Sequence, residues 1–175
     1  AKTGIDLQVV SPTPYFPPIK RFGRWYLWSQ MPRYEVVDGL EVFNYVSDWL
    51  ELQVETTGLS HVPKTGRAML IANHPAGIAD GIAVYDALRE RRDDIVFFAN
   101  RDAIRMAPGL AAKISPVEWV EDKRSGERQR EMIRHIVDAF RSEKLVVIFP
   151  SGRLAYFRWD GLTERPWQTT AVNLA

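Results

Sequence analysis

Hydrophobic residues recur along the chain with two different periods, and their order predicts where helices and strands form. In residues 40–50 the apolar side chains follow the spacing of one helix face, which predicts a helix. Residues 52–59, LQVETTGL, alternate and are rich in β-branched side chains, which predicts a strand. The apolar run AMLIAN at 68–73 predicts a buried strand, and GIAVYDALRERR at 81–92 predicts a helix that ends in a basic turn.

The second half of the chain continues this alternation. The short apolar runs IVFFAN at 95–100 and LVVIF at 145–149 predict parallel core strands. Between them, a single apolar stripe predicts a helix from about residue 125 to about residue 144. The last residues, WQTTAVNLA at 167–175, predict a further strand. Strands that alternate with helices indicate an α/β fold in which helices cover a mixed, largely parallel sheet.

The N-terminal residues have a different character and predict an arm. Residues 11–18, SPTPYFPP, contain four prolines and favour an extended, irregular conformation. In residues 20–28, basic side chains lie among aromatic ones, a mixture that suits either the headgroup level of a membrane or an arm packed on the domain. We therefore predict an arm at 1–38 and an α/β domain at 39–175. Because the chain stops inside its last predicted strand, a domain truncated at its C-terminus is one expectation.

The composition narrows the classes of protein and partner. The chain has 175 residues, of which 46% are hydrophobic, enough for one core that folds without disulfides. With 23 basic and 22 acidic side chains, the overall charge indicates no nucleic-acid partner. The absence of cysteine excludes disulfides, thiolate metal sites and a cysteine nucleophile. No apolar stretch approaches the roughly 20 residues that span a bilayer, and the first residues do not resemble a secretion signal, so the expected location is the cytoplasm.

The segment NHPAGIAD, residues 73–80, carries the clearest candidate chemistry. It follows a predicted strand, and ligands of open α/β sheets bind at the carboxyl ends of the strands. His74 can act as a general base if a carboxylate fixes its tautomer, and Asp80 is the candidate carboxylate. Pro75 and Gly77 would turn the loop so that Asp80, at the helix start, approaches the ring. The alternative is a loop histidine without a catalytic role and an aspartate that caps the helix.

The surroundings of this segment bear on the type of reaction. No serine lies in a GxSxG elbow beside His74, so the group to be activated would belong to the substrate, which favours direct transfer. The other two histidines, His61 and His135, lack ligand-like spacing to His74, and we therefore predict no metal site.

A second candidate motif, FPSGR at 149–153, follows the predicted strand LVVIF. Its turn can direct backbone N–H groups at an anion, while Arg153 offers a planar fork that matches phosphate. Ser151, Gly152 and Arg153 are therefore candidate substrate-binding residues for a phosphate or carboxylate. The alternative is an arginine that is solvated or ion-paired at the surface.

The two motifs, in this order, resemble the glycerolipid acyltransferase family, also called the lysophosphatidate or glycerol-3-phosphate acyltransferase family. The lead-in GLSHVPKTGRAMLIANHPAGIAD is similar to the segment that precedes the family's His-x4-Asp motif, and the resemblance extends from Leu52 to the end. It implies a glycerol-3-phosphate-acyltransferase-like fold. It also implies that His74 deprotonates the acceptor and that Asp80 orients His74.

The chain departs from the family pattern at both motifs. Five residues, not four, separate His74 from Asp80. The family's Phe-Pro-Glu-Gly-Thr-Arg block appears here as FPSGR, with Ser151 in place of the glutamate and one residue fewer before Arg153. These departures resemble the branch that contains hemolysin-named proteins and the acyltransferases of ornithine-lipid synthesis.

The resemblance also implies an arginine between the motifs that helps to hold the acceptor's phosphate. In ISPVEWVEDKRSGE the nearest candidates are Lys123 and Arg124, without a clear match. Arg101 and Arg105 follow the predicted strand at 95–100 and are further basic candidates, with solvated helix arginines as the alternative.

Together, the residues and the resemblance predict an acyltransferase of phospholipid biosynthesis. It would move a fatty acyl group from acyl-CoA or acyl carrier protein to a hydroxyl or amine of a lysophospholipid-like acceptor, without a cofactor, at the inner face of the membrane. The alternative is a lipid-binding or membrane-associated protein that keeps this fold and has lost acyl transfer, which Ser151 and the longer loop would favour. A hydrolase is a third hypothesis and would release thiol without an acceptor.

Overall fold

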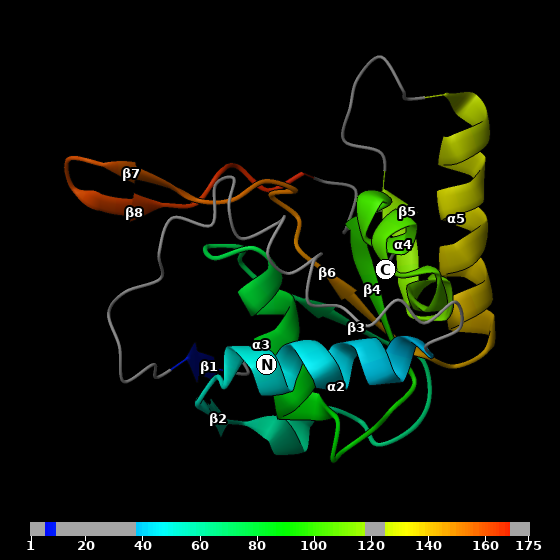
Figure 1. Ribbon diagram of the computed structural model, residues 1–175, viewed down its shortest axis with the longest axis horizontal. Coiled ribbons are helices and arrows are strands. Elements are labelled where there is room, and N and C mark those ends of the chain that lie inside the picture. Colours follow the sequence, from blue (N-terminus) through cyan, green and yellow to red (C-terminus); the bar gives the residue numbers. More distant parts are fainter. Residues whose placement is uncertain (1–5, 10–37, 118–124, 169–175) are drawn as a thin grey trace.

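A four-stranded parallel sheet forms the centre of the molecule. The computed structural model describes residues 6–9, 38–117 and 125–168. In the sheet, β3 (Ala68–Ile71) pairs with β6 (Leu145–Ile148), β6 with β4 (Ile95–Asn100), and β4 with the edge strand β5 (Ile114–Val117) (Figure 1). Three of these strands correspond to the apolar runs in the sequence, and the predicted parallel α/β sheet is confirmed.

Helices cover both faces of this sheet. Helices α2 (Gly39–Leu50) and α3 (Ile78–Leu88) pack on one face, where Phe43 lies 5.0 Å from Phe97 and 4.9 Å from Tyr85 between ring centroids. Helix α5 (Gly126–Arg141) packs on the other face (Figure 1). Val146 and Val147 of β6 are completely buried, each in a different one of these two cores. Burial of such a side chain contributes about 1.5–3 kcal/mol, so the two cores fix β6 at the centre of the domain.

The helix boundaries differ in part from the predicted ones. Helices α2 and α5 begin and end close to the predicted positions, and the Ser125 hydroxyl accepts a hydrogen bond from the N–H of Arg128 at the start of α5. Helix α3 was predicted at 81–92 but forms at Ile78–Leu88. It ends earlier because Arg91 and Arg92 leave the helix and donate to backbone carbonyls of the preceding loop instead.

Two small antiparallel sheets and several short helices complete the described part. Strand β1 (Asp6–Val9), inside the predicted arm, pairs with β2 (Val54–Thr57), which lies within the strand predicted at 52–59. Strands β7 (Tyr156–Arg158) and β8 (Gly161–Thr163) form a hairpin that projects from the body (Figure 1). The short helices are η1 (Leu59–His61), α4 (Asp102–Met106) and η2 (Pro108–Ala112). In the described portion, no helix has the length and apolarity needed to cross a bilayer.

The predicted strand at 167–175 does not form over the two residues that are described there. Trp167 and Gln168 belong to no strand, and the N–H of Gln168 donates to the carbonyl of Pro150 at 3.0 Å. The rest of that segment, residues 169–175, lies outside the described residues, as do the proline-rich segment at 11–18 and the aromatic segment at 20–28.

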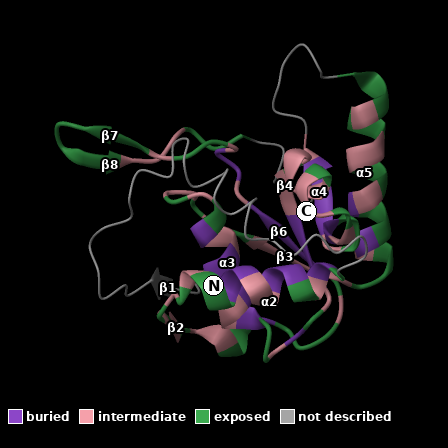
Figure 2. Cartoon of the chain, viewed as in Figure 1, coloured by how far each residue is buried: buried purple, intermediate pink, exposed green. Residues whose placement is uncertain are grey.

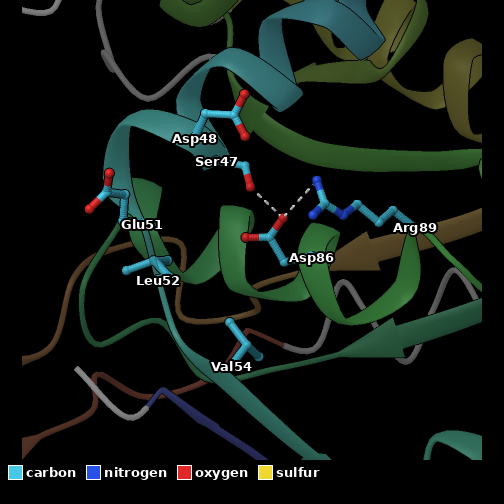
Figure 3. A pocket seen from close by; sticks show the side chains of 7 residues that line it. All are labelled: Ser47, Asp48, Glu51, Leu52, Val54, Asp86 and Arg89. Carbon is cyan, nitrogen blue, oxygen red and sulfur yellow. Dashed lines mark hydrogen bonds and ion pairs between the residues drawn. The ribbon is translucent and has the colours of Figure 1, made fainter. Parts of the chain in front are cut away.

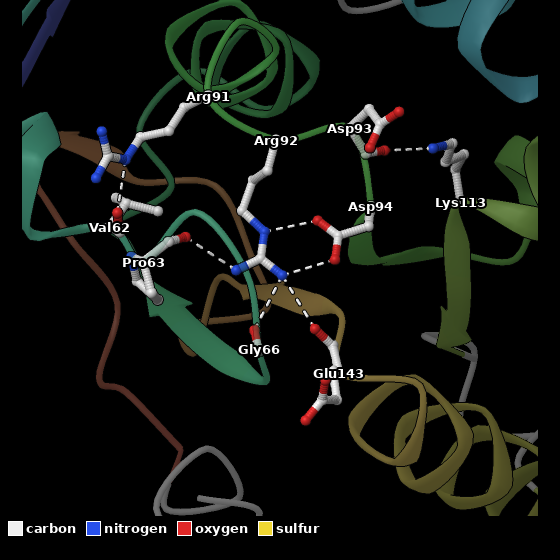
Figure 4. Close-up of polar contacts among 9 residues, drawn as sticks. All are labelled: Val62, Pro63, Gly66, Arg91, Arg92, Asp93, Asp94, Lys113 and Glu143. Carbon is white, nitrogen blue, oxygen red and sulfur yellow. Dashed lines mark hydrogen bonds and ion pairs between the residues drawn. The ribbon is translucent and has the colours of Figure 1, made fainter.

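A buried arginine ties together the segments that lead into the sheet. The Arg92 side chain is 2% exposed and donates to both carboxylate oxygens of Asp94 at 2.6 Å (Figure 4). It also donates to the carbonyls of Pro63, Gly66 and Glu143. The hydrogen bonds from Arg92 to the carboxylate lower the pKa of Asp94. The bonds to the carbonyls hold the loop before β3 against the turn before β6. The same clamp therefore sets the relative position of the two strands whose ends carry the sequence motifs.

Candidate active site

The two sequence motifs meet at the carboxyl ends of β3 and β6, which are neighbours in the sheet. The N–H of Ala72 donates to the carbonyl of Ile148 at 3.0 Å and extends the pairing of these strands by one residue. Beyond it, the His74 ring stacks on Phe149, with centroids 4.6 Å apart and an interplanar angle of 25°. The structure thus places NHPAGIAD beside FPSGR, at the edge where open α/β sheets bind ligands.

His74 and Asp80 face each other across the loop between β3 and α3. The Nδ1 atom of His74 lies 3.0 Å from Oδ2 of Asp80, and the two side chains are 21% and 12% exposed. The contact is bent, and among the described residues no acceptor is aligned with the buried Nδ1. Because Nδ1 faces the carboxylate, Nε2 is the ring nitrogen left to exchange a proton with a substrate. The loop of five intervening residues therefore brings the carboxylate to the imidazole.

Asp80 also holds the loop itself. Its Oδ2 accepts the backbone N–H groups of Ala76 and Gly77, each at 2.8 Å. Gly77 is the N-cap of α3 and Asp80 the third residue of that helix, so the carboxylate supplies the acceptor half of a capping box, while glycine has no side chain to return the bond. The two interpretations weighed from the sequence, a helix-capping aspartate and a partner of His74, therefore describe the same side chain, although Asp80 is not itself the N-cap.

Gly77 is required by the backbone of this loop. Its φ of +80° with ψ of −120° is a conformation that residues with a side chain avoid. A Cβ atom at this position would also lie 2.9 Å from Cδ2 of Leu154, in the segment that follows FPSGR. The loop and that segment are therefore in close contact.

One residue of the site, Glu164, was missed by the sequence analysis. Its Oε1 accepts the backbone N–H of His74 at 3.1 Å, and the carbonyl of His74 accepts the N–H of Ala155 at 3.1 Å. Both contacts come from the segments that flank the β7–β8 hairpin. No local pattern marks Glu164, because 90 residues separate it from His74.

The FPSGR turn is held mainly by its own hydrogen bonds. The hydroxyl of Ser151, which is buried, donates to the carbonyl of Arg153 at 3.0 Å, and the N–H of Gly152 donates to the carbonyl of Phe149 at 3.0 Å. Gly152 has a φ of +60°, which favours glycine. Arg153 is exposed and makes no ion pair within the described part of the chain. The structure therefore brings Ser151, Gly152 and Arg153 to the same edge as His74, where the Ser151 hydroxyl and the Gly152 N–H are engaged within the turn and the Arg153 side chain is exposed.

Arg101 occupies a different environment. It follows β4, and its guanidinium forms an ion pair with Glu131 of α5, which lowers the pKa of that carboxyl group. Arg105 pairs with Asp102 in α4. Arg101 therefore fastens α5 over the sheet, and the structure does not bring it into contact with His74. Lys123 and Arg124 lie outside the described residues.

A hollow of about 520 Å³ lies between α2, α3 and the segment that leads into β2, apart from this site (Figure 3). Three of its polar side chains interact with one another, because the Ser47 hydroxyl donates to Oδ1 of Asp86 at 2.6 Å and Arg89 pairs with the same carboxylate. None of the candidate catalytic or substrate-binding residues lines it. Within the described residues, no cluster of histidine and carboxylate side chains could hold a metal ion.

The structure is an α/β domain with a parallel sheet and a histidine–carboxylate pair at the carboxyl edge of that sheet. The chain belongs to the Acyltransferase family, whose model matches residues 53–175. The match covers nearly the same residues as the resemblance found in the sequence and confirms it.

Two curated relatives show which members of the family this chain is similar to. The lyso-glycine lipid O-acyltransferase of Phocaeicola vulgatus is 24% identical over 135 residues, which cover 77% of this chain and 47% of that protein. The protein of the same name from Bacteroides thetaiotaomicron is 23% identical over 134 residues, with the same coverage. The chain thus spans about half the length of these relatives. No solved structure matches it significantly.

Proposed function

We propose that the protein transfers a fatty acyl group from a thioester, acyl-CoA or acyl carrier protein, to the hydroxyl of a lyso-lipid acceptor. The observation that carries this proposal is the approach of His74 Nδ1 to Asp80 Oδ2 within 3.0 Å at the sheet edge. The two curated relatives are named for O-acylation of a lyso-glycine lipid. They support an acceptor that combines a free hydroxyl, one acyl chain and an amino-acid headgroup, in line with the ornithine-lipid resemblance.

In the proposed mechanism, His74 is the general base. Its Nε2 takes the proton of the acceptor hydroxyl while the oxygen forms a bond to the thioester carbonyl carbon. The tetrahedral intermediate then breaks its carbon–sulfur bond, and the imidazolium returns the proton to the departing thiolate. The carboxylate of Asp80 fixes the tautomer with the proton on Nδ1 and stabilises the imidazolium between the two steps.

The oxyanion of this intermediate needs hydrogen-bond donors. The N–H groups of Ala76 and Gly77 are already bound by Asp80, so they are not available for this role. We assign it to other N–H groups in the first turn of α3, where the positive end of the helix dipole also favours a negative charge. The exposed Arg153, in the FPSGR turn at the same sheet edge, would meet the carboxylate or phosphate of the acceptor headgroup.

The acceptor and the product are lipids, so we place the reaction at a membrane surface, on the cytoplasmic side. The aromatic and basic segment at 20–28 is one candidate contact and lies outside the described residues. Peripheral attachment would let the site meet its acceptor without removing the lipid from the bilayer.

The alternative, a lipid-binding protein that has lost acyl transfer, rests on Ser151 and the lengthened loop. The buried Ser151 hydroxyl is engaged in its own turn, where it donates to the carbonyl of Arg153. The longer loop still brings His74 and Asp80 together. The contact between His74 and Asp80 favours an active enzyme over the alternative.

The test is thiol release from palmitoyl-CoA, with and without lyso-glycine lipid, lyso-ornithine lipid and common lysophospholipids. We expect release that depends on an acceptor and falls by about 10²- to 10⁴-fold in His74→Ala, with an unchanged circular-dichroism spectrum. His61→Ala is the matched control, because His61 is exposed on η1 and should leave turnover unaltered. Acceptor-independent release would indicate a hydrolase. If the protein bound lipid but released no thiol from palmitoyl-CoA or from palmitoyl-acyl carrier protein, the result would favour the lipid-binding alternative.

A further inference from the structure

The β7–β8 hairpin exposes large aromatic side chains on an element that the rest of the described residues do not cover. Phe157 is 85% exposed and Trp159, at the tip, is 91% exposed. Leu162 and Trp167 nearby are about half exposed. Figure 2 shows the hairpin almost entirely in the colour of exposed residues, projecting away from the sheet. A two-stranded hairpin is only marginally stable in water by itself, and exposed aromatic clusters of this kind mark interaction sites.

The charges on the hairpin and its flanks specify the chemistry of that partner. Arg158 and Arg153 are exposed, and the guanidinium of Arg165 lies 4.8 Å from the centroid of the Tyr156 ring. These three arginines outnumber the acidic side chains of the same segment, which are Asp160, 3.9 Å from Arg158, and Glu164, which accepts the backbone N–H of His74. Tryptophan and phenylalanine next to arginines suit the headgroup level of an anionic bilayer. A second copy of the same hairpin would instead bring arginines against arginines.

The hairpin is also joined directly to the catalytic loop. Ala155, just before β7, donates to the carbonyl of His74, and Glu164, just after β8, accepts its N–H. Leu154 lies against Gly77. A surface that binds the hairpin is therefore held next to the candidate base.

We propose that the β7–β8 hairpin docks the protein on an anionic lipid bilayer, with Phe157 and Trp159 inserted at the headgroup level. This inference rests on the proposed acyl transfer to a lipid, because it explains how an acceptor in the bilayer reaches His74. It assigns the membrane contact to a described element that adjoins the site, in addition to any contact made by the N-terminal arm.

The experiment is sedimentation of the chain with vesicles of phosphatidylcholine, with and without phosphatidylglycerol. We expect the wild type to bind the anionic vesicles, and the Phe157→Ser/Trp159→Ser variant to bind about tenfold or more weakly. The matched control is Trp49→Ser/Ile133→Ser, which removes two exposed apolar side chains from α2 and α5 and should bind like the wild type. Arg158→Glu should weaken binding to anionic vesicles only, and circular dichroism verifies the fold of each variant.

A second readout is quenching of tryptophan fluorescence by brominated lipids, which should decrease in Trp159→Phe. The proposal would be overturned if the wild-type protein did not bind anionic vesicles, or if the hairpin variant and the control variant lost vesicle binding equally. A dimer in solution that dissociates in the hairpin variant would assign this surface to a second copy instead. Turnover of a short-chain thioester and acceptor in free solution tests the acyltransferase activity separately. Vesicle binding without such turnover would contradict the proposed function and leave hairpin docking supported.

Discussion

The backbone N–H of His74 donates a hydrogen bond to Oε1 of Glu164 at 3.1 Å, across 90 residues of sequence. Since the bond fixes the backbone that carries the imidazole, Glu164 is a positioning residue of the site. We expect Glu164→Ala to lower kcat by about 5- to 30-fold with little change in KM, the cost of one such hydrogen bond. Steady-state kinetics of acyl transfer provide the measurement.

The conservative variant separates this role from a chemical one. Glu164→Gln keeps an acceptor oxygen for the His74 N–H and should recover most of the activity. If the glutamine variant were as slow as the alanine variant, the charge of Glu164 would act on the reaction itself. An unchanged kcat in Glu164→Ala would show that the other contacts of the loop are sufficient to place His74.

Asp80 combines two roles that substitution can separate. Asp80→Asn keeps an oxygen for the N–H groups of Ala76 and Gly77 but removes the charge that faces His74. We expect it to lose activity on the order of 10³- to 10⁴-fold while its free energy of unfolding stays close to that of the wild type. Asp80→Ala should lose the same activity and in addition about 0.5–2 kcal/mol of stability. Denaturant unfolding beside acyl-transfer assays gives both quantities, and equal stability of the two variants would contradict the capping role.

Local patterns in the sequence were sufficient for the core of the fold. Strand β6 is buried along its whole length and β4 over its first half, so each appears as a continuous apolar run. Strand β3, predicted as a buried strand, lies instead at an edge of the sheet and is only partly buried, with Ile71 41% exposed. Strand β5 was missed because it contains Pro116 and the buried Ser115. A proline is tolerated there because β5 lies at the sheet edge. The β7–β8 hairpin is exposed on both faces and has no apolar period, although the pair Asp160-Gly161 at its turn was a usable hairpin signal.

The candidate site could be predicted only where its residues are close in sequence. His74 and Asp80 lie in one loop, so their spacing indicated a pair. Glu164 comes from a distant hairpin, and only the folded chain shows its contact with His74. For Arg101, the place after a strand suggested substrate binding. In the structure its guanidinium forms an ion pair with Glu131 of α5, a contact that no pattern in the sequence indicated.

Gly77 should tolerate no side chain, because the strain lies in its backbone. At a φ of +80° and ψ of −120°, Gly77→Ala is expected to cost about 1–3 kcal/mol and to displace the loop that carries His74. The contact with Leu154 adds less, since that leucine side chain can move. Thermal unfolding and acyl-transfer assays check both effects.

Two further variants test the cause of this cost. Leu154→Ala, combined with Gly77→Ala, should rescue little if the backbone conformation dominates. Gly81→Ala is the matched control, because Gly81 lies inside α3 with open space where its Cβ would be. It should stabilise the protein by about 0.5–1 kcal/mol. Full rescue by Leu154→Ala would assign the cost to steric contact instead.

Acid should destabilise the fold through Asp94 and Glu131, two carboxylates held by arginines. A hydrogen bond from Arg92 lowers the pKa of Asp94 below its usual 3.8, and one from Arg101 lowers the pKa of Glu131 below its usual 4.5. A folded-state pKa below the unfolded value adds stability that is present above the unfolded pKa and is lost as the pH falls through the folded one. The free energy of unfolding should therefore begin to fall near pH 4.5 and continue to fall below pH 3.8.

Urea unfolding from about pH 7 to about pH 3 measures this dependence. Asp94→Asn and Glu131→Gln should each lower stability at neutral pH and flatten the acid limb, because the substituted group no longer takes up a proton on unfolding. The effect of Asp94→Asn should be the larger, since it leaves the buried Arg92 without its carboxylate, whereas Arg101 is partly solvated. An acid limb as steep in both variants as in the wild type would show that other carboxylates govern acid unfolding.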